Sequence, residues 1–252
     1  MVKIAIVGYG KMGKLIEKVA ISKGHEIVSI IDPIQEKTAK EISVSTLNGA
    51  DVCIDFTHPS VIIDNIRKYC ELKVNAVIGT TGWYDRKDEI EAMVSDAGIG
   101  LIWSGNFSIG VNAYFKVVEF AAKLFNNVPD YDVMGNEFHH KNKADSPSGT
   151  ASMVTDILVN NIDRKEKVVT DRFDRPPLKN ELHFASVRGG SIPGIHQVLF
   201  DSEADTIELK HTARNREGFA YGSVLAAEFI FDKKGFFGIN DLMDTIIKKD
   251  NN

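Results

Sequence analysis

The N-terminal part of the chain alternates between short apolar runs and segments with helical spacing. The runs with the composition of buried strands are residues 2–7, 26–31, 51–55, 76–78 and 100–103. The segment after the first run places Met12, Leu15, Ile16 and Val19 on one face of a helix, and residues 85–97 have a similar pattern. Strands without apolar–polar alternation are covered on both faces, so this half predicts a parallel sheet between helices.

The pattern changes after about residue 105, where longer amphipathic segments alternate with strand-like runs. Helices are expected at residues 109–125, 147–159, 217–231 and 239–247, and strands at 132–137, 183–187, 196–200 and 206–211. Ser146 suits the cap of the second of these helices and Pro147 its first turn. Consecutive strands with short turns favour an open mixed or antiparallel sheet. The polar stretch 164–180 is expected to be a loop, with a short strand at 167–170 as the alternative.

Glycines follow the first expected strand in the sequence VGYGKMG, which contains Gly8, Gly10 and Gly13. Between a strand and a helix, such glycines permit a tight turn and let a pyrophosphate approach the helix N-terminus. Asp32 ends the next strand, where a carboxylate can accept hydrogen bonds from a ribose. A glycine-rich turn without a ligand is the simpler alternative, but the combined pattern favours a dinucleotide-binding domain.

The charges around this loop bear on which dinucleotide binds. Asp32 would repel a 2′-phosphate, and the residues that follow it offer no basic side chain before Lys37. Lys11 is the cation within the glycine loop. We therefore expect NADH to be accepted, while NADPH stays open through Lys11 or Lys37.

Other loops begin where expected strands end, which is where ligands bind in open α/β sheets. In DFTHPS, capping of a following helix is an equally good interpretation of Asp55 and Thr57. The loop GTTG at 79–82 is too rich in small, flexible residues to serve packing, so we expect it near the nicotinamide. SGNF at 104–107 is a similar small-residue turn that leads into a helix. For Phe107, a contact with the nicotinamide and a place in the core are equally supported.

Composition narrows the class of protein. Hydrophobic residues are 43% and charged residues 26% of the chain, which is typical of a globular protein, and the formal net charge is −5. Because there is no long run of Lys or Arg, we expect neither a nucleic-acid nor an anionic-membrane partner. Cys53 and Cys70 lie in apolar surroundings, as buried thiols do, and the N-terminus enters a strand without the features of a secretory signal. We therefore expect a cytoplasmic protein.

The stretch EFHHKNKADSPSGTAS concentrates chemically active residues. His139 and His140 point to opposite faces of a strand, and no third ligand stands at zinc-like spacing, so no metal site is expected. A solvated charged loop is the simplest alternative. Against it, residues 146–150 build a helix N-terminus that can bind an anion, and Gly149 lets a ligand come close. His140, Lys141 and Lys143 add positive charge. We expect a site for a carboxylate-bearing substrate, with His139 and Lys143 as candidate proton donors.

Taken together, these motifs resemble the dihydrodipicolinate reductase (4-hydroxy-tetrahydrodipicolinate reductase) family. The resemblance rests on GxGxMG, IDFT, GTTG, NFSIGVN and E-x-HH-x-x-K-x-D-x-PSGTA, and it extends to RGG at 188–190, GIH at 194–196 and HTARNR at 211–216. It covers nearly the whole chain. It implies reduction of a cyclic unsaturated dicarboxylate by a hydride from NADH or NADPH, which gives tetrahydrodipicolinate in lysine and diaminopimelate biosynthesis.

The resemblance also implies roles for individual residues. The catalytic residues would be His139 and Lys143, and the substrate carboxylates would bind to His140, Ser148, Gly149 and Thr150. The cofactor would bind to Gly8, Tyr9, Gly10, Lys11, Met12, Gly13, Asp32, Gly79, Thr80, Thr81, Ser104, Gly105, Asn106 and Phe107. A homotetramer without a metal is implied.

The pattern and the resemblance together predict an α/β fold. A Rossmann-type doubly wound parallel sheet, from residues 1–106 and 216–252, would bind the dinucleotide. A second α+β domain on an open mixed sheet, residues 107–215, would bind the substrate and form the oligomer. Many relatives carry His where Asn142 stands and an alanine-rich turn at Ser104-Gly105, and the segment after Asp32 lacks a basic residue that is common there. The preference between NADH and NADPH therefore stays open.

Other roles and functions remain as alternatives. A structural role is preferred for His183, His196 and His211, and Arg216 either caps the helix at 217 or reaches the active site. A related amino-acid-pathway dehydrogenase, of the aspartate or homoserine dehydrogenase type, has the same two-domain plan but leaves HHKNKADSPSGT unexplained. A non-catalytic NAD(H)-responsive binding protein would bind the cofactor without turnover.

Overall fold

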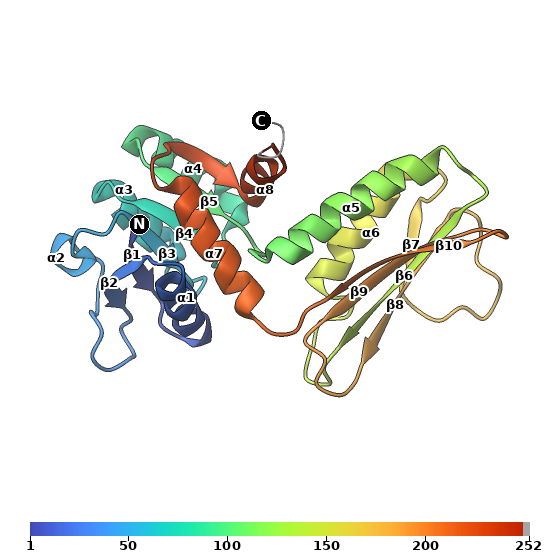
Figure 1. Cartoon of the computed structure of the whole chain (residues 1–252), viewed down its shortest axis with the longest axis horizontal. Helices are drawn as coiled ribbons and strands as arrows, with labels where there is room; N and C mark the ends of the chain where they lie inside the picture. The colour runs from blue at the N-terminus through green and yellow to red at the C-terminus, as the bar shows by residue number, and fades with distance from the viewer. Residues whose placement is uncertain (249–252) are drawn as a thin grey trace. The chain divides into compact units, whose positions relative to one another are not determined.

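The computed structural model describes residues 1–248, and the chain divides into two compact units (Figure 1). Unit 1 is Met1–Asn112 together with the chain from Arg216 onward, and unit 2 is Ala113–Asn215. The sequence places the first boundary after residue 106, whereas the contacts place it after Asn112, inside helix α5 (Ile109–Asn126). No helix within residues 1–248 combines the length and the apolar character that crossing a membrane requires.

The described part of unit 1 forms a six-stranded parallel sheet between two layers of helices (Figure 1). Its strand order is β11-β5-β4-β3-β1-β2. The strands are β1 (Lys3–Val7), β2 (Glu26–Ile31), β3 (Val52–Asp55), β4 (Asn75–Ile78), β5 (Gly100–Trp103) and β11 (Gly235–Gly238). The helices are α1 (Lys11–Ser22), α2 (Val44–Leu47), α3 (Ile62–Glu71), α4 (Lys87–Ala97), α7 (Glu217–Ile230) and α8 (Ile239–Lys248), with a short 3-10 turn (Tyr84–Arg86) before α4.

Alternate residues of the central strands face two separate cores. Ile4 and Ile6 of β1 pack in a core with α1 and α7, whereas Ala5 and Val7 pack on the opposite face with α3 and α4. Because both faces are buried, these strands are apolar at consecutive positions. The prediction of a doubly wound, Rossmann-type sheet is confirmed.

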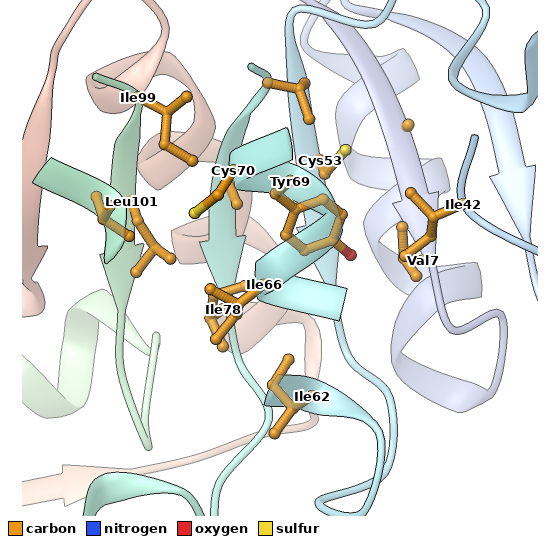
Figure 2. Close-up of a cluster of buried hydrophobic side chains, with 14 of the residues drawn as sticks. Val7, Ile42, Cys53, Ile62, Ile66, Tyr69, Cys70, Ile78, Ile99 and Leu101 are labelled. Atoms are coloured by element: carbon orange, nitrogen blue, oxygen red, sulfur yellow. The ribbon is translucent and has the colours of Figure 1, made fainter. Parts of the chain in front are cut away.

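The core under α3 also holds both thiols (Figure 2). Ile62, Ile66 and Tyr69 of α3 are fully buried against the sheet. Cys53 and Cys70 lie in the same core as free cysteines. Burial raises the pKa of the Cys53 thiol, which keeps it protonated and unreactive.

Two elements of unit 1 are missing from the sequence prediction because they are too short to carry a periodic signal. Helix α2 is a single turn held by a capping box, in which the N–H of Thr46 donates to the Ser43 hydroxyl and the N–H of Ser43 donates to the Thr46 hydroxyl. Strand β11 reads GFFG, lies at the edge of the sheet and pairs with β5.

Unit 2 is built on a five-stranded mixed sheet with the order β10-β9-β6-β8-β7 among the described residues. The strands are β6 (Asp132–His139), β7 (Lys167–Val169), β8 (Glu181–Arg188), β9 (Ile195–Asp201) and β10 (Thr206–Thr212). β6 is antiparallel to β9 and parallel to β8, so the predicted open mixed sheet is confirmed. The alternative of a short strand near 167–170 is also confirmed. Glu137 and His139 share the buried face of β6, because positions two apart on a strand lie on one face.

The start of helix α6 (Gly149–Asn161) differs from the prediction. Ser148, not Ser146, is the N-cap, because its hydroxyl accepts a hydrogen bond from the Ala151 N–H. Pro147 precedes the helix and follows a cis peptide bond with Ser146. The helix N-terminus is therefore formed by Gly149 and Thr150.

Gly222 of α7 generates a prediction about packing within unit 1. A Cβ at this position would stand 1.7 Å from the backbone oxygen of Phe107, which cannot rotate away as a side chain would. We expect Gly222→Ala to lower the free energy of unfolding by about 1–3 kcal/mol or more, the usual cost of overpacking. Thermal unfolding followed by circular dichroism would show this as a lower Tm.

Gly218→Ala, in the first turn of the same helix, is the matched control. Its Cβ would meet the Ser108 hydroxyl at 3.3 Å, a group that can move, and alanine favours a helix over glycine. We expect its Tm to stay within about 2 °C of the parent. A Gly222→Ala protein with an unchanged Tm would contradict the close approach of α7 to the Phe107 loop.

Candidate active site

Glycine is needed at the three positions of the GYGKMG loop for different physical reasons. Gly8 has a φ of +87°, and a Cβ there would lie 2.4 Å from the Phe56 backbone oxygen; a Cβ at Gly13 would lie 2.3 Å from the Gly8 oxygen. At Gly10, a Cβ would meet no described atom within 4 Å. Two glycines are thus required for packing, while Gly10 leaves open space before the first turn of α1, which has no side-chain cap. That space suits a phosphate at a helix N-terminus.

Asp32 is held in its ionised form by the same loop. Its carboxylate accepts hydrogen bonds from the backbone N–H groups of Tyr9 at 2.7 Å, Ile34 at 2.8 Å and Gln35 at 3.1 Å. Burial opposes ionisation, but these N–H groups and the Lys40 ammonium lower the pKa of Asp32 below its usual value. The sequence reasoning missed Lys40, whose ammonium donates to the carbonyl oxygens of Gln35 and Asp32.

A fully buried carboxylate, Asp55, ties together the loops after β3 and β4. It accepts hydrogen bonds from the Tyr69 hydroxyl and the Thr57 hydroxyl, each at 2.7 Å, and from the Thr80 hydroxyl at 3.3 Å. Thr80 also accepts from the Thr57 N–H at 2.8 Å. Asp55 therefore organises the two loops from beneath, which goes beyond the capping role considered for it.

These loops and the glycine loop line one cavity of about 420 Å³ within unit 1. Its lining residues are Gly10, Lys11, Met12, Phe56, Thr57, Pro59, Gly79, Thr80 and Thr81. The structure thus brings together the expected cofactor residues of the glycine and GTTG loops. Gly79 is required by packing, since a Cβ there would lie 2.2 Å from the Phe56 ring.

The turn after β5 is held by its own polar side chains. Ser104 accepts from the Asn106 N–H, and Asn106 accepts from the Ser108 N–H, each at 2.9 Å. Gly105 is exposed at the tip of this turn. Phe107 is 1% exposed and packs in the core with α1 and α7, so its place in the core is settled.

In unit 2, Glu137 is the centre of the polar cluster. It is 0% exposed, and its carboxylate accepts from the Ser148 N–H at 2.9 Å, the Ser148 hydroxyl, the Ser186 hydroxyl at 2.8 Å and Arg188 Nη2 at 2.8 Å. Burial opposes ionisation, yet hydrogen bonds from His196, Ser148 and Arg188 hold the pKa of Glu137 well below its usual range. The carboxylate is therefore ionised. Sequence reasoning missed Glu137, although its spacing from His139 on a strand was a usable signal.

His139 lies beside this carboxylate and is nearly buried. Its Nδ1 atom is 3.2 Å from Glu137 Oε2, and its ring meets the His196 ring at a centroid distance of 5.2 Å. Burial lowers the pKa of His139 to about 4; the charge of Glu137 opposes this shift, and the nearby His196, Lys143 and Arg188 add to it. His139 is therefore neutral at physiological pH, and this argues against a charged imidazolium as the proton donor.

Lys143 follows β6 in the same loop and brings a positive charge. Its ammonium lies 2.8 Å from Asp145 Oδ1, and the Lys143 side chain keeps some exposure to solvent. This pairing lowers the pKa of the Asp145 carboxyl. His140 is half-buried, and its backbone N–H donates to the Ile192 oxygen at 2.8 Å. The loop therefore presents a neutral histidine and a lysine from one short segment of chain.

The start of α6 offers its N–H groups to the same region of unit 2. Both the N–H and the hydroxyl of Ser148 are committed to Glu137, and Ser148 is 2% exposed. Gly149 is exposed and Thr150 is half-buried, so the first N–H groups of the helix are the ones a ligand can reach. The structure thus places His139, Lys143, Gly149 and Thr150 in one unit, with Ser148 as the buried support.

His183 and His211 pack against aromatic rings, whereas Arg216 lies at the start of α7. His183 packs on Phe173 at a ring distance of 4.9 Å. His211 packs on Tyr114 at 6.1 Å, and burial lowers the pKa of His211. Arg216 stands at the N-cap position of α7, but its side chain makes no capping hydrogen bond.

A possible metal set also converges here, which the spacing along the sequence did not suggest. Among the described residues, Glu137, His139 and His196 present ligand atoms within 4.8 Å of one another. The Arg188 guanidinium, however, is 2.8 Å from Glu137 Oε1 and already balances the single negative charge of the group. A divalent cation would meet strong repulsion from that guanidinium.

Comparisons with known proteins match both halves of the chain to one family. Residues 2–107 match the family described as dihydrodipicolinate reductase, N-terminus, and residues 110–243 match dihydrodipicolinate reductase, C-terminus. The chain is 33% identical to the 4-hydroxy-tetrahydrodipicolinate reductase of Christiangramia forsetii, over 97% of this chain and 99% of the relative. It is 37% identical to the enzyme of that name from Ralstonia nicotianae, over 96% and 99% of the two chains.

The fold is shared with solved structures. A dipicolinate-bound dihydrodipicolinate reductase from Paenisporosarcina sp. TG-14 has a TM-score of 0.76 at 23% identity, over 94% of this chain and 97% of that chain. An amine dehydrogenase from Mycobacterium smegmatis has a TM-score of 0.59 at 13% identity, over 94% of each chain. The two-unit architecture therefore also occurs in amine dehydrogenases.

The environment of His139 generates a prediction about its titration. Its pKa is lowered from 6.5 to about 4, so the folded protein resists protonation of this ring. Between those two pH values the unfolded chain takes up a proton that the folded chain does not, and stability therefore falls as the pH falls. Two-dimensional ¹H–¹⁵N NMR, with the resonance assigned by its loss in His139→Asn, should give a midpoint near pH 4. A midpoint at or above 6.5 would contradict the burial described here.

Proposed function

The chain belongs to the dihydrodipicolinate reductase family, and we propose that it reduces 4-hydroxy-tetrahydrodipicolinate to tetrahydrodipicolinate with a nicotinamide dinucleotide. The reaction consumes one hydride and one proton and releases the 4-hydroxyl group as water. A bound nicotinamide supplies the hydride. The observation that carries the proposal is the grouping in unit 2 of His139, Lys143 and the N-terminus of α6, which suits a dicarboxylate that must receive a proton.

The roles of the side chains follow from their charge states. Lys143 is the proton donor, because its partly exposed ammonium, 2.8 Å from Asp145 Oδ1, comes from the same short segment as His139. His139 is neutral and orients the substrate through its ring nitrogen. His140, Gly149 and Thr150 bind the carboxylates, the last two through N–H groups at the start of α6.

The cofactor is held by unit 1. The open space at Gly10 and the uncapped first turn of α1 fit a pyrophosphate, and Asp32 fits the adenosine ribose. We propose that NADH is preferred over NADPH. Asp32 is ionised, and Lys40, the nearby cation, already donates to backbone carbonyl oxygens. A 2′-phosphate would therefore meet a fixed negative charge.

The alternatives considered from the sequence are less well supported. Amino-acid dehydrogenases have a related architecture, but both halves of this chain match the reductase family. A binding protein without turnover would have no use for a neutral histidine and a lysine beside a helix N-terminus. A homotetramer is part of this proposal, as the family resemblance implies.

Steady-state kinetics test the catalytic roles. With NADH and the product of a dihydrodipicolinate synthase, the protein should consume NADH, followed as loss of absorbance. We expect Lys143→Ala to lower kcat by about 10²–10⁴-fold, the range for acid–base groups. His139→Ala should lower kcat by about 10²-fold, the cost of a misplaced substrate. NADH affinity should stay nearly unchanged, because unit 1 is untouched.

Lys141→Ala is the matched control for Lys143→Ala. It removes a cation from the same loop, but Lys141 is exposed, so kcat should change less than about threefold. A well-folded parent protein that binds NADH and shows no turnover would exclude the proposed reaction. Wild-type kcat in either alanine variant would exclude that residue as a catalytic group.

Cofactor preference gives a separate test of the Asp32 assignment. Asp32→Ser removes the charge that faces a 2′-phosphate, and like charges in contact cost several kcal/mol. The ratio of kcat/KM for NADPH to that for NADH should therefore rise by at least about tenfold. Glu36→Gln, which neutralises an exposed neighbour, should leave the ratio within about threefold. An Asp32→Ser ratio equal to the parent's would place the ribose elsewhere.

A further inference from the structure

One buried carboxylate in unit 2 is surrounded by groups from several elements near the candidate substrate site. Glu137 is reached by groups from its own strand β6, from the neighbouring strands β8 and β9, and from the cap of α6. These groups are His139, Ser186, Arg188, His196 and Ser148. Ser148, Ser186 and Arg188 donate hydrogen bonds to the carboxylate. Ring nitrogens of His139 and His196 lie 3.2 Å and 3.3 Å from its Oε2 atom. The carboxylate therefore serves as an acceptor at the centre of this group.

The first consequence concerns the tautomer of His139. Its Nδ1 atom is buried, makes no well-angled hydrogen bond among the described residues and lies 3.2 Å from Glu137 Oε2. An ionised carboxylate has no proton to give, so the neutral ring is favoured with its hydrogen on Nδ1 and a lone pair on Nε2. A Cβ at Gly194 would lie 3.0 Å from that Nε2 atom, so the absence of a side chain there keeps Nε2 accessible.

The second consequence concerns the anion-binding end of α6. The Ser148 hydroxyl has one hydrogen, which it donates to Glu137, while its oxygen caps the Ala151 N–H. Because that hydrogen is used, His196 Nε2, 3.2 Å from the same hydroxyl, must carry its own hydrogen. Glu137 thereby fixes the backbone at Ser148, and with it the following N–H groups of Gly149 and Thr150.

The third consequence concerns the Lys143 loop. Arg188 Nη2 donates both to Glu137 at 2.8 Å and to the backbone oxygen of Asp145 at 2.7 Å. Asp145 in turn pairs with Lys143. The carboxylate therefore supports, through one guanidinium, the segment that presents the second catalytic residue.

We propose that Glu137 is a positioning residue that sets the Nδ1–H tautomer of His139 and aligns the start of α6 with it. The inference rests on the proposed reductase function. Glu137 itself takes no part in proton transfer, because its donors and the Arg188 charge keep it ionised. Glu137 fixes the position of the His139 ring hydrogen and the backbone at the start of α6. Its loss is therefore expected to change both kcat and the KM for the dicarboxylate.

Glu137→Gln is the decisive variant. The amide has nearly the same shape, but its NH₂ group faces donors that need an acceptor, so the cluster must rearrange. We expect kcat to fall by about 10²–10⁴-fold and the KM for the dicarboxylate to rise, while the KM for NADH stays within about twofold. Ser186→Ala is the matched control, because it removes one donor to the same carboxylate and leaves the charge in place. Its kcat should stay within about threefold of the parent.

The tautomer provides a readout that needs no turnover. In the parent protein at neutral pH, ¹⁵N-detected NMR of labelled histidine should show His139 with hydrogen on Nδ1. Glu137→Gln should shift this resonance toward the Nε2–H form, whereas Ser186→Ala should not. An Nε2–H tautomer in the parent overturns the proposal even if Glu137→Gln does not fold, and so does a folded Glu137→Gln with parental kcat. If the parent shows the Nδ1–H form but no reductase activity, the proposed function fails while the positioning geometry stands.

Discussion

A carboxylate that is fully removed from water must be surrounded by donors, and both units build their ligand loops around such a group. Asp55 in unit 1 gathers neutral donors, the hydroxyls of Tyr69, Thr57 and Thr80. Burial raises the pKa of Asp55 despite them. Glu137 in unit 2 also gathers the Arg188 guanidinium, and its pKa falls. Asp55 joins two loops by packing and hydrogen bonds, whereas Glu137 keeps a negative charge beside the His139 ring.

Burial explains how a neutral histidine stands close to a lysine in one short segment. A protonated His139 would repel the Lys143 ammonium. Burial avoids this repulsion, because it keeps the His139 ring neutral. In the proposed reaction, the site carries one proton donor, Lys143, and one fixed dipole, the His139 ring. A dicarboxylate entering the site meets net positive charge from Lys143 and the N-terminus of α6, with the charge of Arg188 already balanced.

The sequence predicts the elements of this structure better than the contacts between them. The strands at 26–31 and 100–103 have their predicted limits, because apolar runs bounded by polar residues leave little choice. The start of α6 was misplaced, since Ser146 and Ser148 are equally good caps by composition and only the contact with Glu137 distinguishes them. The separation of His139 from His140 follows from the period of a strand. The cluster of Glu137 with His196 and Arg188 does not, because it depends on which strands pair and in what register.

That register joins motifs that are far apart in the sequence into one functional unit. Glu137 stands opposite Ser186 on β8 and His196 on β9, and His139 stands opposite Arg188. E-x-HH, the Arg of RGG and the His of GIH therefore meet because three adjacent strands present them at matching positions. A slip of one residue between β6 and either neighbour would turn the partners to the other face of the sheet. The identity of these residues and the pairing of the strands thus constrain each other, since the buried charge of Glu137 is tolerable only in this register.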